Sequence, residues 1–375
     1  MKFLLLTSLL MALTAPVAQA QARDTAAARL AGGERWRTDF SRRTVPSHEI
    51  LSGGPPKDGI SAIDYPRFET AAQAGGWLKA RDPVMVVEHG GVARAYPLGI
   101  LVWHEIVNDE VAGLPVAVTF CPLCNTALVF DRRLGNQLLN FGTTGRLRHS
   151  DLVMYDRQTE SWWQQASGEG IIGQLAGRKL QRVPSTTLAW SSARQLHPRI
   201  QVLSRNTGYS RPYGRNPYVG YDNPRGRPLA DFFRGKPDPR LPAMERLVAV
   251  ELGRGWAVPV STLRPLRVVN AEVEGTPFTV FWTAGAASAL DRKEIAAGRD
   301  VGQSVVFDRR VQGRVLTFRP ARNGFQDRET GSLWDLAGRG VLGPLRGHRL
   351  RAVPHDNPFW FAWITFRPQT EVWRP

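Results

Sequence analysis

Two stretches of the chain repeat each other in the same order, which limits the folds open to it. The paired strings are LVFDRR (128–133) with VVFDRR (305–310), DRQTESWW (156–163) with DRETGSLW (327–334), and IIGQLAGRKLQRVP (171–184) with VLGPLRGHRLRAVP (341–354). Upstream of these strings, Pro97, Asn108, Gly113 and Pro115 match Pro259, Asn270, Gly275 and Pro277. We therefore predict two copies of one structural unit, at roughly 82–200 and 245–372.

Each copy has the pattern of a strand-rich unit. Short β-branched runs separated by Gly, Pro or Asn, such as PVMVVEH (83–89) and TALVFDR (126–132), predict strands, whereas 70–80 and 186–198 predict short helices. The 36 Gly and 27 Pro agree with a chain rich in turns. The predicted fold is a β-rich α+β fold of two internally repeated β-rich units, related by a pseudo-twofold and packed as one body.

The predicted organisation has four parts. Residues 1–20 form a signal peptide, 21–81 an N-terminal extension that straps the body, 82–244 the first repeat unit, and 245–375 the second. The first unit ends with a loop-rich segment, 204–228, in which Gly, Pro, Asn and Tyr are frequent. Because this segment is too aromatic for a flexible linker, we expect it to pack across the first unit.

The N-terminus predicts export. Lys2 supplies a positive charge, a short apolar run follows, and Ala18-Gln19-Ala20 matches a cleavage site. The run is too short to span a bilayer comfortably, and no later stretch reaches about 18 apolar residues. We therefore expect a periplasmic or secreted protein without a membrane span after cleavage.

The net charge of +16 bears on the partners of the chain. Most of this charge comes from scattered arginines, with no basic tail and no basic helix stripe. This distribution argues against nucleic acid as a partner. A non-enzymatic binding module whose basic surface contacts an acidic partner remains an alternative.

The chain has only two cysteines, Cys121 and Cys124, in the string CPLCN. At the spacing of the repeat they fall on Thr283 and Ala286, so the second copy lacks them. In the same register, His104, Glu105 and Asp109 fall on Leu266, Arg267 and Ala271. Since the framework residues agree and these residues differ, the comparison predicts a functional site in the first unit alone.

Three roles are open for the cysteine pair. A disulfide would close a loop of about four residues and remove little entropy from the unfolded chain. Thiol redox chemistry would use Cys121 and Cys124, with His104 as base or thiolate partner and Glu105 and Asp109 orienting it. In the metal-binding alternative, a C-P-x-C turn between strands presents Cys121 and Cys124 to copper or zinc, with His104 as a further ligand.

Polar residues near the cysteines are candidates for a substrate pocket. They are Asn108, Asn125, Arg148, Asp151, Tyr155 and Gln164. Asn125 can also adopt the left-handed conformation that ends such a turn. The pocket would serve an unknown small molecule or redox partner.

Several strings together resemble one bacterial family of exported proteins. WHEIVND, CPLCNTALVFDR, SDLVMYDRQTESWWQQ, RPYGRNPYVGYD and FWFAWITFRP are similar to the family filed as domain of unknown function 3179, over about Ser52 to Pro368. The family brings no assigned reaction. Some members are described as selenoproteins, which implies redox use of a Cys-type residue at Cys121 or Cys124. The resemblance favours a thiol-redox protein, with the metal-binding protein as the alternative.

Overall fold

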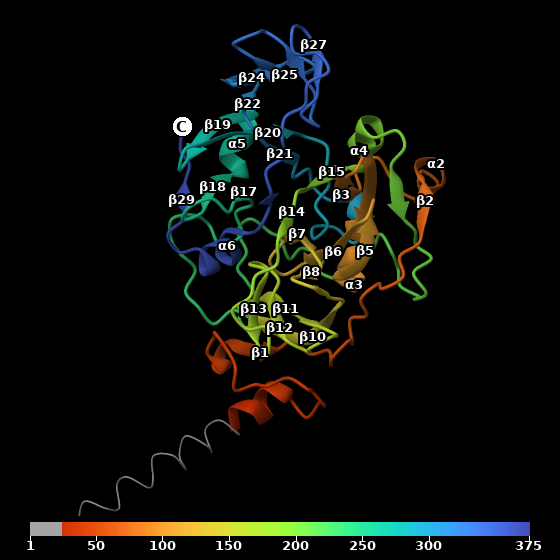
Figure 1. Cartoon of the computed structure of the whole chain (residues 1–375), viewed down its shortest axis with the longest axis vertical. Helices are drawn as coiled ribbons and strands as arrows, with labels where there is room; N and C mark the ends of the chain where they lie inside the picture. The colour runs from red at the N-terminus through yellow and green to blue at the C-terminus, as the bar shows by residue number, and fades with distance from the viewer. Residues whose placement is uncertain (1–24) are drawn as a thin grey trace, which may run out of the picture.

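The computed structural model describes residues 25–375 (Figure 1). The predicted signal peptide, residues 1–20, lies outside the described residues. The described chain consists mainly of short strands in several sheets, with a few short helices between them. The predicted β-rich fold is confirmed at this level.

The first half of the chain forms three main sheets. The sheet β15-β3-β4-β16-β2 consists of Ser185–Ala189, Pro83–His89, Val92–Pro97, Gln201–Leu203 and Phe68–Thr70. The sheet β14-β7-β6-β5 consists of Arg182–Val183, Thr126–Asp131, Leu114–Cys121 and Ile106–Val111. The sheet β1-β10-β11-β12-β13 consists of Ile50–Ser52, Phe141–Arg148, Asp151–Asp156, Trp162–Gln164 and Glu169–Ile172. Further elements are the hairpin β8 (Arg133–Leu134) and β9 (Gln137–Leu138), the 3-10 turn η1 (Ser47–Glu49), and the helices α2 (Ala71–Ala74), α3 (Leu98–His104) and α4 (Trp190–Leu196). Residues 25–31 are also helical.

The second half also forms three main sheets. The sheet β28-β17-β18-β29 consists of His355–Asp356, Leu247–Val250, Trp256–Pro259 and Glu371–Val372. The sheet β19-β20-β21 consists of Val268–Val273, Thr276–Thr283 and Gln303–Asp308. The sheet β24-β25-β26-β27 consists of Phe318–Ala321, Gly324–Asp327, Leu333–Trp334 and Gly340–Leu342. The remaining elements are the hairpin β22 (Arg310–Val311) and β23 (Arg314–Val315), the 3-10 turn η2 (Ile295–Ala297), and the helices α5 (Val260–Leu266) and α6 (Trp360–Phe366).

The strings that recur in the sequence make the same local contacts. Asp156 accepts a hydrogen bond from the indole Nε1–H of Trp163 at 2.9 Å, and Asp327 accepts one from Trp334 at 2.8 Å. These carboxylates are buried, and each also accepts a backbone N–H of the turn that follows it. Each Asp therefore fixes a turn and anchors a fully buried indole, which explains why both strings keep these residues.

The two halves contact each other through ion pairs and a shared core. Arg349 of the second half bonds both carboxylate oxygens of Glu88, and Lys179 of the first half lies 2.5 Å from Glu251. One hydrophobic cluster contains Val86 of β3 together with aromatic residues of β20 and β21. In Figure 1 the β24-β25-β26-β27 sheet lies at one end of the molecule, and the β1-β10-β11-β12-β13 sheet lies toward the other end, next to the N-terminal segment.

Two predicted helices are shorter in the structure than in the sequence analysis. The helix expected at 70–80 is confined to Ala71–Ala74, because Gly75 and Gly76 follow it. In the range 186–198, the first residues belong to strand β15 and the helix begins at Trp190. Three tyrosines of the loop-rich segment 204–228, Tyr213, Tyr218 and Tyr221, pack on a core formed mainly by the first half, as predicted. The segment also bonds the backbone of the second half at Asp291 and Lys293.

Candidate functional site

The two cysteines lie in a tight turn between neighbouring strands of one sheet. Strand β6 ends at Cys121, β7 begins at Thr126, and these two residues pair across the turn. The N–H of Asn125 donates to the carbonyl of Pro122 at 3.2 Å, and Asn125 has φ 53°. Asn125 thus takes the left-handed conformation that the sequence predicted. Both cysteines are free thiols and are buried.

A carboxylate from another strand joins the thiols. Asp151, the first residue of β11, is fully buried. One of its carboxylate oxygens, the Sγ atom of Cys121 and the Sγ atom of Cys124 all lie within 4.8 Å of one another. Its Oδ2 accepts from Gln164 Nε2 at 2.5 Å and from the N–H of Ala166 at 2.9 Å. Its Oδ1 has no nitrogen or oxygen donor within the described part of the chain, and the thiol of Cys124 is the other hydrogen-bond neighbour of this carboxyl.

Burial and acidic neighbours make negative charge unfavourable at this site. Burial raises the pKa of Asp151 to about 7. Burial also raises the pKa of both thiols, and the nearby carboxyl of Asp151 raises it further. Without a cation, the three groups are therefore mostly neutral in the folded protein below pH 7.

Glu105 is a further buried acid beside the group. It ends helix α3 with φ 58°, a conformation that costs energy for a residue with a Cβ. Burial raises the pKa of its carboxyl to about 8, with a further contribution from Asp151. The charge of Glu105 also raises the pKa of the Cys121 thiol, so a proton on Glu105 favours the thiolate.

Residues far away in the sequence enclose the thiols. The hydroxyl of Tyr221, in the loop-rich segment, donates to the carbonyl of Leu123 at 2.8 Å. From the second half, the N–H of Phe359 donates to the carbonyl of Cys124 at 3.0 Å, and Asn125 Nδ2 donates to the carbonyl of Asn357 at 2.5 Å. These contacts hold the cysteine turn between the two halves of the chain.

His104 is not a member of the thiol–carboxylate group. Its Nδ1 lies 2.7 Å from the carbonyl oxygen of Ser61, and its Nε2 lies 2.7 Å from the hydroxyl of Tyr213. Both ring nitrogens are therefore occupied by partners that link the N-terminal extension to the loop-rich segment. The sequence predicted His104 as the third ligand beside the two thiols. In the structure, Asp151 lies in that position instead.

Three other sequence candidates take part in the framework. Asp109 lies 2.6 Å from the guanidinium of Arg94 and accepts from the hydroxyl of Tyr96 at 2.5 Å. Asn108 bonds the backbone N–H and carbonyl of Phe141, and Tyr155 donates to Asp58 at 2.5 Å. Asn270 bonds the backbone of Phe318 in the way that Asn108 bonds Phe141, which fits a scaffold role for Asn108.

Gln164 and Arg148 connect the buried group to the surface. Gln164 donates to Asp151, and its Oε1 accepts from Arg148 Nη1 at 3.3 Å. Arg148 also bonds Glu49 and lines a surface cavity of about 400 Å³. Gln164, Arg148 and Asp151 were predicted together because they belong to one short polar stretch, whereas Tyr221 and Asn357 were not predicted. The aromatic composition of the loop-rich segment was the only signal for Tyr221.

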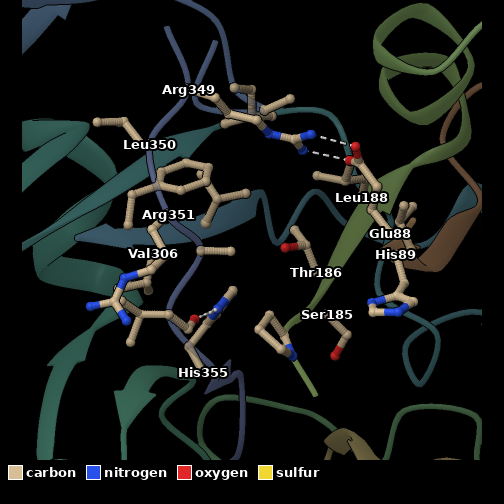
Figure 2. A pocket seen from close by; sticks show the side chains of 18 of the residues that line it. Glu88, His89, Ser185, Thr186, Leu188, Val306, Arg349, Leu350, Arg351 and His355 are labelled. Carbon is tan, nitrogen blue, oxygen red and sulfur yellow. Dashed lines mark hydrogen bonds and ion pairs between the residues drawn. The ribbon is translucent and has the colours of Figure 1, made fainter. Parts of the chain in front are cut away.

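A separate cavity of about 390 Å³ lies between the two halves (Figure 2). Figure 2 shows Ser185 and Thr186 on one side of it and Leu350 and Arg351 on the other, with Arg349 bonded to Glu88 above them. His355 also lines this cavity, with its ring nitrogens near the carbonyls of Val353 and Ser304. The cavity lining includes none of the three residues of the thiol–carboxylate group.

Fold and site define a β-rich protein with two thiols and a carboxylate buried together at the junction of its two halves. The chain belongs to the family described as "Protein of unknown function (DUF3179)", whose model matches residues 57–370. Searches of curated proteins and of solved structures found no match. Among residues 25–375, no helix has both the length and the apolar character needed to cross a membrane.

Proposed function

We propose that this chain is an exported metal-binding protein that holds one metal ion through Cys121, Cys124 and Asp151. The proposal rests mainly on the convergence of two thiols and a carboxylate oxygen within 4.8 Å of one another, all buried. When ionised, two thiolates and a carboxylate held this close repel one another, and a bound cation would remove that repulsion.

The free oxygen of Asp151 supports a ligand at this place. A buried carboxylate oxygen with only a weakly donating thiol beside it costs free energy that a metal bond would recover. The pKa values of the thiols and of Asp151 are raised in the metal-free state, so binding a cation would release protons. Metal affinity should therefore increase with pH.

Zinc fits the donor set best. Two thiolates and a carboxylate are common zinc ligands, and they carry three negative charges against the two positive charges of zinc. Copper(I) prefers thiolate ligands and binds a carboxylate more weakly. The two ions are therefore separable by whether Asp151 contributes to affinity.

Thiol redox chemistry is a second candidate, favoured by one observation. The sulfurs of Cys121 and Cys124 lie within 4.8 Å of each other in a single turn, so a disulfide needs only a small shift. Burial and acidic neighbours oppose it, because both raise the thiol pKa and so lower the fraction of nucleophilic thiolate. For this reason the metal role ranks first.

Two related expectations complete the proposal. We infer that the halves are copies of one unit in a pseudo-twofold arrangement, and that only the first keeps the site, since Thr283 and Ala286 replace the cysteines. We also infer that residues 1–20 direct export to the periplasm or beyond, where a bound metal would protect the thiols from oxidation.

Elemental analysis of the mature protein, purified anaerobically with a reductant, tests the proposal. About one zinc per chain is expected, with at least a tenfold loss in Cys124→Ser and Asp151→Asn. Asp327→Asn is the matched control, because Asp327 is also a buried carboxylate but lies in β25 of the second half, outside the group. Absence of metal together with a reversible change of two thiols would favour the redox candidate. Retention of zinc by the double Cys→Ser variant would exclude the proposed site.

A further inference from the structure

The sheets β1-β10-β11-β12-β13 of the first half and β24-β25-β26-β27 of the second half have equivalent rows of cross-strand neighbours. In the sheet of the first half, the row is Gly142, Tyr155, Trp162 and Ile172. In the sheet of the second half, the matching row is Arg319, Gln326, Leu333 and Leu342. Directly paired residues of an antiparallel sheet point to the same face, so each row marks one face of its sheet.

The first face is covered by the N-terminal extension. Trp36 packs against Trp162 with ring centroids 5.0 Å apart, and Phe40 packs against the same indole at 5.3 Å. The extension also adds to the edge of β13, where the N–H of Thr44 donates to the carbonyl of Ile171 at 3.0 Å. As a result Trp162 is fully buried.

The second face has no such cover within the described chain. Leu342 is 58% exposed, whereas its counterpart Ile172 is fully buried. Val341, the counterpart of Ile171, is also exposed and lies on the free edge of β27. Figure 1 shows the extension beside the sheet of the first half and the β24-β25-β26-β27 sheet at the far end of the molecule.

Charge distinguishes the partner of the second face from the extension that covers the first. In the first half, Glu160 binds the extension through the N–H of Arg37 and through Lys57. Gly331 occupies the corresponding position in the second half, so this acidic anchor is missing. A segment that depends on this acidic anchor would therefore lose that contact in the second half.

Arg328 shows which charge the missing cover carries. Its counterpart Arg157 pairs with Asp64 of the extension at 2.8 Å. Arg328 is exposed and makes no ion pair and no side-chain hydrogen bond within residues 25–375. The same holds for the exposed Arg322 and Arg346 around this sheet.

We propose that the outer face and free edge of the β24-β25-β26-β27 sheet bind an extended, acidic polypeptide segment of a partner protein. The segment adds a strand at β27 as Thr44 does at β13, places an apolar or aromatic side chain over Leu333 and Leu342, and supplies a carboxylate to Arg328. This surface is independent of the proposed metal site.

The extension provides the template for a defined probe. The probe is a peptide of residues 33–48 in which Arg35, Arg37, Arg42 and Arg43 are replaced by Glu, which keeps Trp36 and Phe40 and reverses the charge. Binding to the mature protein is measured by fluorescence anisotropy and calorimetry. We expect one peptide per chain with a Kd below about 100 µM.

Matched variants locate the binding. Leu342→Asp and Arg328→Glu should each weaken the peptide at least tenfold, and the unmodified basic peptide should recover affinity for Arg328→Glu. Leu138→Asp, at a 50% exposed leucine of the β8–β9 hairpin, and Arg227→Glu, at an exposed arginine outside this sheet, are the controls and should bind normally.

Three outcomes overturn the proposal. The first is an absence of saturable binding, and the second is binding that Leu342→Asp leaves intact. The third is that the protein does not bind the peptide but binds vesicles containing anionic phosphatidylglycerol, and that Leu342→Asp abolishes the vesicle binding. This result would assign the face to a lipid surface instead. None of these variants alters the thiols. The zinc content of each protein therefore tests the proposed metal site independently of peptide binding.

Discussion

Replacing Asp151 by Asn should change how the stability of the metal-free protein depends on pH. The pKa of Asp151 is about 7 in the folded chain, against an ordinary value of 3.8. This difference of roughly three pH units, at about 1.4 kcal/mol each, corresponds to about 4 kcal/mol of unfolding free energy. The Asn side chain keeps an oxygen that can accept from Gln164 and Ala166, so the local packing should survive.

The direction follows from which state ionises first. Below pH 3.8 the carboxyl is protonated in both states and contributes no difference. Between pH 3.8 and about 7 the unfolded chain ionises while the folded chain stays protonated, so folding stability falls as the pH rises. Above about pH 7 the full loss is present. The Asp151→Asn protein lacks this term and should be more stable than the wild type at pH 8 by up to about 4 kcal/mol, with little difference at pH 4.

Zinc should offset this stability difference between the two proteins at pH 8. A ligand present at about a thousand times its Kd stabilises the folded state by about 4 kcal/mol, and the variant should gain far less. The assay is urea unfolding with a reductant at pH 4 to 8, with a chelator or with excess zinc. If the unfolding free energies of the two proteins in chelator depend on pH in the same way, Asp151 is not a buried carboxyl that stays neutral in the folded chain. Equal stabilisation of both by zinc would refute Asp151 as a ligand.

Three further predictions concern other residues. His104→Gln should retain the metal, measured by elemental analysis. It should lose about 1–3 kcal/mol of unfolding free energy in urea, because two hydrogen bonds of the ring are disturbed. Loss of metal would show that His104 is a ligand after all. Asp156→Ala and Asp327→Ala should destabilise the chain by similar amounts, about 2–4 kcal/mol each, because both lose an indole and a turn partner, and clearly unequal values would contradict equivalent roles. Asn125→Ala should lower the thermal midpoint, costing about 1–3 kcal/mol, because it removes the bond to Asn357 and puts Ala at a positive φ, and an unchanged midpoint would contradict this.

Features that depend on neighbouring residues were predictable. The turn CPLCN lies between two strands, and Asn125 takes the left-handed conformation, because short-range sterics decide both. The tyrosines of the segment 204–228 pack on the core because a chain of this composition gains from burying aromatic rings. The helix expected at 70–80 was too long because Gly75 and Gly76 follow Ala74 at once.

The third donor to the thiols could not be predicted in the same way. His104 was chosen because it precedes the strand that delivers Cys121, but its ring turns to Ser61 and Tyr213. Asp151 reaches the thiols because β11 brings its first residue beside the cysteine turn. Spacing along the chain does not report which strand ends meet in space, since strand pairing joins residues far apart in sequence.

The amino-acid sequence by itself determined that the chain is rich in strands, that two of its stretches match, and that its two thiols stand in one turn found in only one of them. These properties follow from residue order, strand periodicity and turn chemistry. The tertiary structure alone decided that the turn is buried, that Asp151 faces it, and that Phe359 and Asn357 of the second half close it. Burial and the pKa values that follow from it arise from contacts across more than two hundred residues, and no local pattern encodes such contacts.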